Sequence, residues 1–177
     1  MKVLLHACCA PCSAYVCEFL ENEGYEITIY FYNPNIFPTE EYEKRKNELI
    51  KFCELKNYNL ILGEEDFNSW NDYIKGLEQE PERGKRCEKC FYFRLEKTAI
   101  LAKEQNIENF TTTLSISPHK DFKTIEKVGN ELTEKYGIKF LNYNFKKNDG
   151  YKKSTLLSQK YGFYRQNYCG CKYSIRM

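Results

Sequence analysis

The feature that most constrains the fold is the start of the chain, where a short apolar run leads into three closely spaced cysteines. Residues 3–5 are typical of a buried strand, and Pro11 suits the first turn of a helix, where a missing N–H costs nothing. Cys8, Cys9 and Cys12 would therefore lie where a strand passes into a helix N-terminus, a common place for sites in open α/β sheets. Such a terminus favours thiolate, the form of cysteine that binds metals and attacks electrophiles.

Strand-like and helix-like segments alternate along the rest of the chain. We expect strands at 26–32, 59–62, 110–114 and 139–143, and helices at 13–23, 40–56, 68–77, 87–105, 121–136 and 150–161. This alternation requires crossover connections, so it predicts an α/β fold with a mainly parallel sheet and helices on both faces. Neither a GxGxxG dinucleotide fingerprint nor a GxxxxGK[ST] phosphate loop occurs. We expect residues 1–177 to form a single domain with a basic, Tyr-rich C-terminal segment at about 139–177.

Cysteine usage indicates the compartment. Nine cysteines among 177 residues are too few for a secreted disulfide scaffold, and their number is odd. The apolar run near the start is too short for a signal peptide, and no segment approaches the ~18 apolar residues of a membrane span. We therefore expect a cytoplasmic protein without a membrane partner, in which clustered cysteines serve metal or redox chemistry.

The net charge of +2 hides an asymmetry along the chain. From Lys139 onward there are nine basic residues and one acid, Asp149, so this end carries +8 and residues 1–138 carry −6. A basic end interleaved with tyrosines suits a polyanionic partner such as RNA. A solvated Lys-rich surface would have the same composition, so charge alone leaves both interpretations open.

The second cysteine group, Cys87-x-x-Cys90, opens a predicted helix. Its two sulfurs could face one metal centre, form a dithiol redox pair or remain unlinked. The adjacent Cys8 and Cys9 are poorly placed for a disulfide, because unstrained disulfides have Cα atoms about 5.5–6 Å apart. Ligation is the better use for that pair, with space-filling below the loop as the alternative. The two pairs together offer four thiolates, enough for a 4Fe–4S cluster or a tetrahedral zinc.

The third group, Cys169-Gly-Cys171, lies near the C-terminus in a segment rich in tyrosines. A single intervening glycine permits a small-ring disulfide that should be easily reduced. We interpret the pair as a mobile redox dithiol, with extra metal ligands or inert thiols as alternatives.

The isolated cysteines and the two histidines give weaker signals. Cys17 and Cys53 have no thiol nearby in the sequence, and we interpret both as core residues. His6 lies beside the first thiols and His119 lies in a loop after the fourth predicted strand. Either histidine could donate a proton or simply satisfy backbone carbonyls.

Four motifs occur in order over essentially the whole chain: His6-Ala-Cys-Cys-Ala-Pro-Cys12, Arg86-Cys-Glu-Lys-Cys-Phe-Tyr-Phe-Arg-Leu95, Ser117-Pro-His-Lys120 and Tyr164-Arg-Gln-Asn-Tyr-Cys-Gly-Cys171. Together they resemble the QueH family, the cobalamin-independent epoxyqueuosine reductases. Residues 80–85, which lead into the second cysteine pair, also match. The resemblance implies a Rossmann-like α/β fold related to the adenine nucleotide α-hydrolase type.

The resemblance also implies the chemistry. The reaction would be the last step of queuosine formation in tRNA, a two-electron reduction of the epoxide on the cyclopentane ring to the alkene. The family's 4Fe–4S ligands carry over to Cys8, Cys9, Cys87 and Cys90, and its redox-active pair to Cys169 and Cys171. The family further suggests an additional iron ion, for which Cys12 and Asp66 are our candidate ligands. An external electron donor would be needed.

The implied substrate base lies in a single-stranded anticodon loop, where bases can be splayed out and stacked on aromatic side chains. Tyr164, Arg165 and Tyr168 are candidates for binding it, with the basic C-terminal face holding phosphates. His119 and Lys120 of the third motif are further candidates.

Two rival functions come from other classes. One is a zinc-bearing RNA-binding module without catalysis, and the other is a metal-free thiol oxidoreductase. A structural zinc does not need seven clustered thiols, and thioredoxin-type enzymes place one CxxC on one helix. Both rivals are therefore disfavoured by the cysteine pattern.

Overall fold

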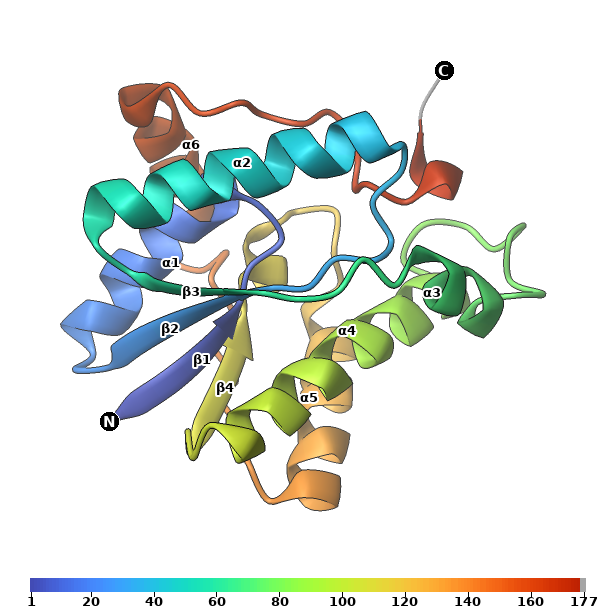
Figure 1. The fold of residues 1–177 in the computed structure, drawn as a ribbon, viewed down its shortest axis with the longest axis horizontal. Coiled ribbons are helices and arrows are strands. Elements are labelled where there is room, and N and C mark those ends of the chain that lie inside the picture. The colour runs from blue at the N-terminus through green and yellow to red at the C-terminus, as the bar shows by residue number, and fades with distance from the viewer. Residues whose placement is uncertain (176–177) are drawn as a thin grey trace.

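A parallel sheet with helices on both faces forms the centre of the computed structural model, which describes residues 1–175 (Figure 1). The strand order is β3-β2-β1-β4-β5, and every neighbouring pair is parallel. The strands are β1 (Lys2–His6), β2 (Glu26–Phe31), β3 (Asn59–Leu62), β4 (Asn109–Thr112) and β5 (Lys139–Phe140). The predicted α/β fold with a parallel sheet is confirmed.

The helices divide between the two faces of the sheet. Helices α1, α2 and α6 pack on one face and α4 and α5 on the other, as Figure 1 shows. The helices are α1 (Ala10–Asn22), α2 (Thr39–Lys56), α3 (Phe67–Tyr73), α4 (Lys85–Glu104), α5 (Phe122–Tyr136) and α6 (Gly150–Tyr161), with short 3₁₀ turns η1 (Thr113–Ile116) and η2 (Lys172–Ser174).

The central strand β1 explains why its sequence is continuously apolar. Val3 and Leu5 face the core shared with α1 and α2, whereas Leu4 faces the core shared with α4 and α5. All three side chains are fully buried. A strand covered on both faces cannot alternate with polar residues, so the apolar run is what a central parallel strand requires.

Two predicted strands are shorter than expected. The predicted strand 110–114 ends at Thr112, whose side chain accepts a hydrogen bond from the backbone N–H of Leu114 and turns the chain into η1. The predicted strand 139–143 is reduced to two residues. There the hydroxyl of Thr111 donates to the carbonyl of Leu141 at 2.9 Å, so a side chain replaces continued pairing at the sheet edge.

The C-terminal part of the chain returns to the helix that follows the first cysteines. The hydroxyls of Ser154 and Ser158 on α6 both donate to the carbonyl of Pro11, at 2.7 and 3.3 Å. Arg176, counted in the basic segment, lies outside the described residues. Within residues 1–175, no helix has the length and apolar character needed to cross a membrane.

Helix α5 approaches the sheet closely at Gly129, where an added Cβ would overlap the ring of Phe140. Gly129→Ala should therefore destabilise the protein by about 1–3 kcal/mol through overpacking, although alanine is the better helix former. Urea unfolding measures the change. Glu131→Ala, at an exposed position of the same helix, is the control and should not destabilise; equal effects would contradict this packing.

Candidate functional site

The carboxyl edge of the sheet brings the three cysteine groups to two adjoining cavities. A cavity of about 220 Å³ is bordered by Cys8, Cys12 and Cys169. A smaller one, of about 20 Å³, is bordered by Cys87, Cys90, Cys169 and Cys171. Segments separated by more than 70 residues therefore share one site, as expected where parallel strands end.

The first group forms a compact set of three sulfurs. Cys9 Sγ lies 3.1 Å from Cys12 Sγ and 3.6 Å from Cys8 Sγ, and all three lie within 4.8 Å of one another. The hydroxyl of Thr113 lies 3.3 Å from Cys8 Sγ, and the side-chain amide of Gln166 donates to Cys9 Sγ at 3.0 Å. Such a set of soft, mostly buried donors suits a thiolate-bound metal or an iron–sulfur centre.

The three sulfurs do not share protons equally. Hydrogen bonds from Cys12 and Cys9 hold the pKa of Cys8 well below its usual value. The same bond to Cys8 raises the pKa of Cys12 well above its usual value. Hydrogen bonds within the group therefore favour negative charge on Cys8 rather than on Cys12.

The second pair lies on the first two turns of α4, which begins two residues earlier than predicted, at Lys85. The backbone N–H of Arg83 donates to Cys87 Sγ at 3.3 Å, and burial raises the pKa of the Cys87 thiol. Cys90 is 6 % exposed. Within the described residues, Cys12 rather than this pair completes the tight group with Cys8 and Cys9. The ligand set inferred from the family stays a prediction.

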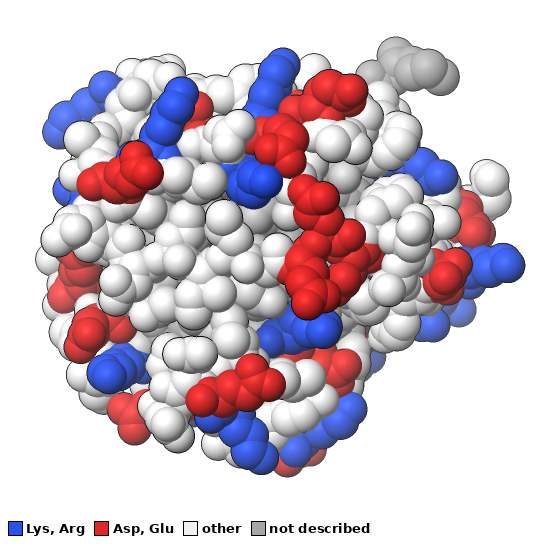
Figure 2. Space-filling model, viewed as in Figure 1, with Lys and Arg blue, Asp and Glu red and all other residues white. Residues whose placement is uncertain are grey.

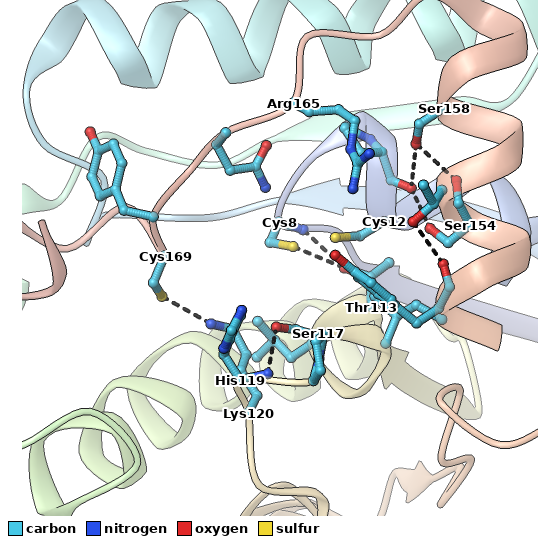
Figure 3. A pocket seen from close by; sticks show the side chains of 18 of the residues that line it. Cys8, Cys12, Thr113, Ser117, His119, Lys120, Ser154, Ser158, Arg165 and Cys169 are labelled. Atoms are coloured by element: carbon cyan, nitrogen blue, oxygen red, sulfur yellow. Dashed lines mark hydrogen bonds between the residues drawn. The ribbon is translucent and has the colours of Figure 1, made fainter. Parts of the chain in front are cut away.

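The third pair is chemically asymmetric. The ammonium group of Lys120 donates to Cys169 Sγ at 3.0 Å, and Figure 3 shows the two side chains meeting across the cavity from Cys8 and Cys12. Burial alone would raise the pKa of Cys169, but the charges of Lys120 and Arg94 outweigh burial and hold it below its usual value. Burial raises the pKa of Cys171 to about 11. Lys120 and Arg94 thus favour the thiolate form at Cys169, whereas burial favours the thiol form at Cys171.

Arg94 is a central residue that our sequence analysis did not single out. It is buried, its Nη1 lies 3.7 Å from Cys90 Sγ, and its Nη2 donates to Asn33 Oδ1 at 2.6 Å. It borders both cavities. Arg94 follows Cys90 by four residues on the same predicted helix, so the two side chains lie on one helix face. That spacing could have identified Arg94 from the sequence.

Two buried N–H groups near the cysteines are free to donate hydrogen bonds to the sulfur atoms of a bound cluster. Arg94 Nε and Trp70 Nε1 are buried without a hydrogen-bond partner among the described residues, and both side chains border the small cavity. Buried donors normally have partners, and sulfur atoms of a cluster would accept from them. The donor set and these N–H groups are therefore compatible with an iron–sulfur centre.

Four of the candidate substrate-binding residues border the larger cavity: His119, Lys120, Arg165 and Tyr168. Tyr164 does not border it, because its hydroxyl donates to the carboxylate of Glu41. The roles of all five candidates stay predictions.

Asp66, the candidate ligand of an additional iron, lies outside both cavities. Its carboxylate accepts a hydrogen bond of 2.8 Å from the hydroxyl of Tyr32. Cys12, the other candidate, lies in the three-sulfur group.

His6 has a structural role. The ring is fully buried, with Nδ1 2.9 Å from the Thr112 hydroxyl and Nε2 3.0 Å from the carbonyl of Tyr32. Burial lowers the pKa of His6 to about 3, helped by the charge of Arg94. These two contacts tie the end of β1 to β4 and to the residue that follows β2, and they engage both ring nitrogens.

Comparison with known proteins identifies the family of this chain. Residues 3–177 match the family model "Epoxyqueuosine reductase QueH". The chain belongs to the QueH family. Relatives named epoxyqueuosine reductase QueH include those of Histophilus somni (46 % identical, covering 99 % of this chain and 72 % of the relative) and Thermotoga maritima (40 % identical, covering 98 % and 90 %).

Solved structures extend the comparison to the fold. A predicted tRNA methyltransferase subunit from Methanocaldococcus jannaschii aligns with a TM-score of 0.61 at 14 % identity, covering 88 % of this chain and 76 % of the other. The U34-tRNA thiolase NcsA from Methanococcus maripaludis, solved with its [4Fe-4S] cluster, aligns at 0.58 and 13 % identity, covering 99 % and 62 %. These two structures therefore share the parallel α/β fold of this chain.

The contact between Lys120 and Cys169 predicts a pH effect. With Lys120→Met the pKa of Cys169 should rise, because its main opposing charge is removed. Thiolates alkylate and thiols do not, so the midpoint of Cys169 alkylation by iodoacetamide should move to higher pH. Mass spectrometry of the labelled peptide measures it. Lys123→Met, an exposed lysine nearby, is the control, and an unchanged midpoint in Lys120→Met would contradict the contact.

Proposed function

We propose that this chain is an epoxyqueuosine reductase that acts on tRNA, removing the epoxide oxygen of epoxyqueuosine to give queuosine. The observation that carries this proposal is the convergence of three distant cysteine groups, with Lys120 and Arg94, on one pair of cavities. The match of residues 3–177 to the QueH family supports the choice of substrate.

The reaction consumes two electrons and two protons, releases the epoxide oxygen as water and leaves an alkene. A dithiol supplies this amount when Cys169 and Cys171 are oxidised to one disulfide, with release of two protons and two electrons. Both cysteines are free thiols in this structure. An external electron donor would then return the pair to the dithiol for the next turnover.

Cys8, Cys9, Cys87 and Cys90 would hold a 4Fe–4S cluster as the cofactor of this site. When bound it supplies electrons one at a time, with a potential set by the hydrogen bonds and charges around its sulfurs. An additional iron ion, with Cys12 and Asp66 as candidate ligands, remains part of the proposal.

Residues that border the larger cavity position the Cys169 sulfur and carry protons that a reaction in the cavity could use. Lys120 keeps the Cys169 sulfur in place at 3.0 Å and holds a proton at Nζ beside the cavity. The backbone N–H of His119 donates to Ser117 Oγ, which fixes the loop that carries both residues. Lys120 or His119 is therefore placed to give a proton to an oxygen leaving a substrate in this cavity.

The substrate base would enter this cavity from a single-stranded anticodon loop, with Arg165 and Tyr168 at its wall. On the face shown in Figure 2, acidic side chains gather near the connection from β3 to α3, where Glu64 and Glu65 are exposed. Such a face repels phosphates, so the tRNA backbone would approach instead from the cavity mouth and the basic residues of α6.

Cys90→Ser should abolish the cluster, because four-thiolate clusters tolerate loss of a ligand poorly. Anaerobic absorption at about 400 nm, with iron and sulfide analysis, measures the cluster. Cys53→Ala removes a thiol from the core on the other face of the sheet and should leave the cluster intact. A colourless parent protein holding one tight zinc would favour the non-catalytic RNA-binding alternative instead.

Cys169→Ser should leave the cluster intact and stop turnover, because a single remaining thiol cannot store two electrons as an intramolecular disulfide. The assay follows the modified nucleoside of epoxyqueuosine tRNA by mass spectrometry, alongside the absorption spectrum. A fully active Cys169→Ser enzyme would remove the dithiol from the mechanism.

A further inference from the structure

Helix α2 carries a buried ion pair that reaches the C-terminal dithiol. The side chain of Arg45 is 1 % exposed, and its Nε donates to Glu41 Oε1 at 2.9 Å. A buried guanidinium is costly unless its other N–H groups also find acceptors. Those acceptors are two successive backbone carbonyls more than 120 residues away, Cys169 at 2.8 Å and Tyr168 at 2.9 Å.

Three consecutive carbonyls of the dithiol segment are bound in this way. The third, that of Gly170, accepts a hydrogen bond of 2.7 Å from the backbone N–H of Phe37, just before α2. No helix or strand covers residues 162–171, so these bonds take the place of regular backbone pairing. With its carbonyl held towards α2, Cys169 presents its sulfur to Lys120 on the other side.

Neighbouring tyrosines add to the same anchor. The ring of Tyr168 lies 5.2 Å from Arg45 Cζ, and the hydroxyl of Tyr164 donates to both oxygens of Glu41, at 3.0 and 2.8 Å. Tyr164, a candidate for binding substrate, therefore contacts the ion pair in this structure.

Gly170 lets the segment come this close. Its φ of +123° is one that other residues rarely adopt, and an added Cβ would lie 2.8 Å from Arg45 Nη1 and 3.0 Å from Ile36 Cγ1. The glycine between the two cysteines is thus required by the contact with Arg45, besides allowing a short disulfide loop.

We propose that the Arg45–Glu41 pair positions the Cys169–Gly170–Cys171 segment, holding the reduced pair with Cys169 against Lys120 and so setting its dithiol–disulfide equilibrium. The catalytic use of that equilibrium rests on the proposed function. Arg45 neither contacts the cavity sulfurs nor borders the larger cavity, so it acts through the backbone carbonyls that it binds, and its nearby positive charge favours negative charge on Cys169 in the same direction.

The test measures the Cys169–Cys171 equilibrium in glutathione buffers of fixed ratio, where glutathione disulfide oxidises the two thiols and yields two glutathione thiols. Alkylation and mass spectrometry read the dithiol fraction in anaerobically purified protein. Arg45→Met should shift the equilibrium at least tenfold towards the disulfide, because the anchored reduced form is lost. The double variant Glu41→Gln/Arg45→Met, which leaves no unpaired buried carboxylate, should shift it equally.

Two further variants sharpen the result. Gly170→Ala should shift the equilibrium in the same direction, whereas Arg45→Lys, which keeps the charge but not the fork of donors, should shift it less. Lys46→Met removes a half-buried cation one residue further along α2, which pairs with Glu43 and Glu65 rather than with the dithiol segment, and it should leave the equilibrium unchanged. Equilibria within twofold of the parent in the Arg45 and Gly170 variants, or an equal shift in Lys46→Met, would overturn the proposal.

Hydrogen exchange tests the contact between α2 and the dithiol segment in the unmodified protein, so the result does not depend on whether the variants fold. The backbone N–H of Phe37 should exchange slowly because Gly170 accepts its bond, and rapid exchange there would overturn the proposal. The two hypotheses fail separately. An active Cys169→Ser enzyme would end the dithiol's catalytic role, whereas an inactive one with unshifted Arg45 variants would end only the role of the anchor.

Discussion

The guanidinium of Arg94 is buried, and the groups packed around it must compensate its positive charge. An uncompensated buried charge costs several kcal/mol, so the surroundings must supply negative charge or strong acceptors. Arg94 interacts electrostatically with Cys90, Cys169 and Cys8, one cysteine from each group, and these sulfurs raise its pKa although burial alone would lower it. The guanidinium of Arg94 therefore favours negative charge at the point where the three cysteine groups meet, at the end of the sheet.

The order of the parallel strands makes this meeting point possible. β1 lies at the centre of the sheet between β2 and β4, so the loops that follow β1 and β4 lie side by side. The first turn of α4 and the C-terminal segment then close the site from two further directions (Figure 1). The C-terminal segment has little regular structure, and its place depends on single interactions such as those of Arg45.

Much of this arrangement was predictable from local pattern. The apolar runs and alternating helices indicated a parallel α/β sheet, and cysteine spacing indicated the three groups. Contacts set by tertiary geometry were not predictable: Arg94 and Arg45 look like ordinary helical surface charges, and only the fold buries them. Nor could the sequence show that the hydroxyl of Tyr164, a candidate for binding substrate, donates to Glu41. The motifs thus indicated the cysteines of the site, whereas long-range packing determines which side chains and carbonyls contact them.

The central claim is that this chain reduces an epoxide in tRNA. The most direct measurement incubates the anaerobically purified protein, a chemical reductant and tRNA carrying epoxyqueuosine, and then follows the modified nucleoside by mass spectrometry. The account predicts loss of one oxygen atom from that nucleoside, with two electrons consumed for each queuosine formed. A protein that holds its iron–sulfur centre and binds the tRNA, yet leaves the nucleoside unchanged, would contradict the account.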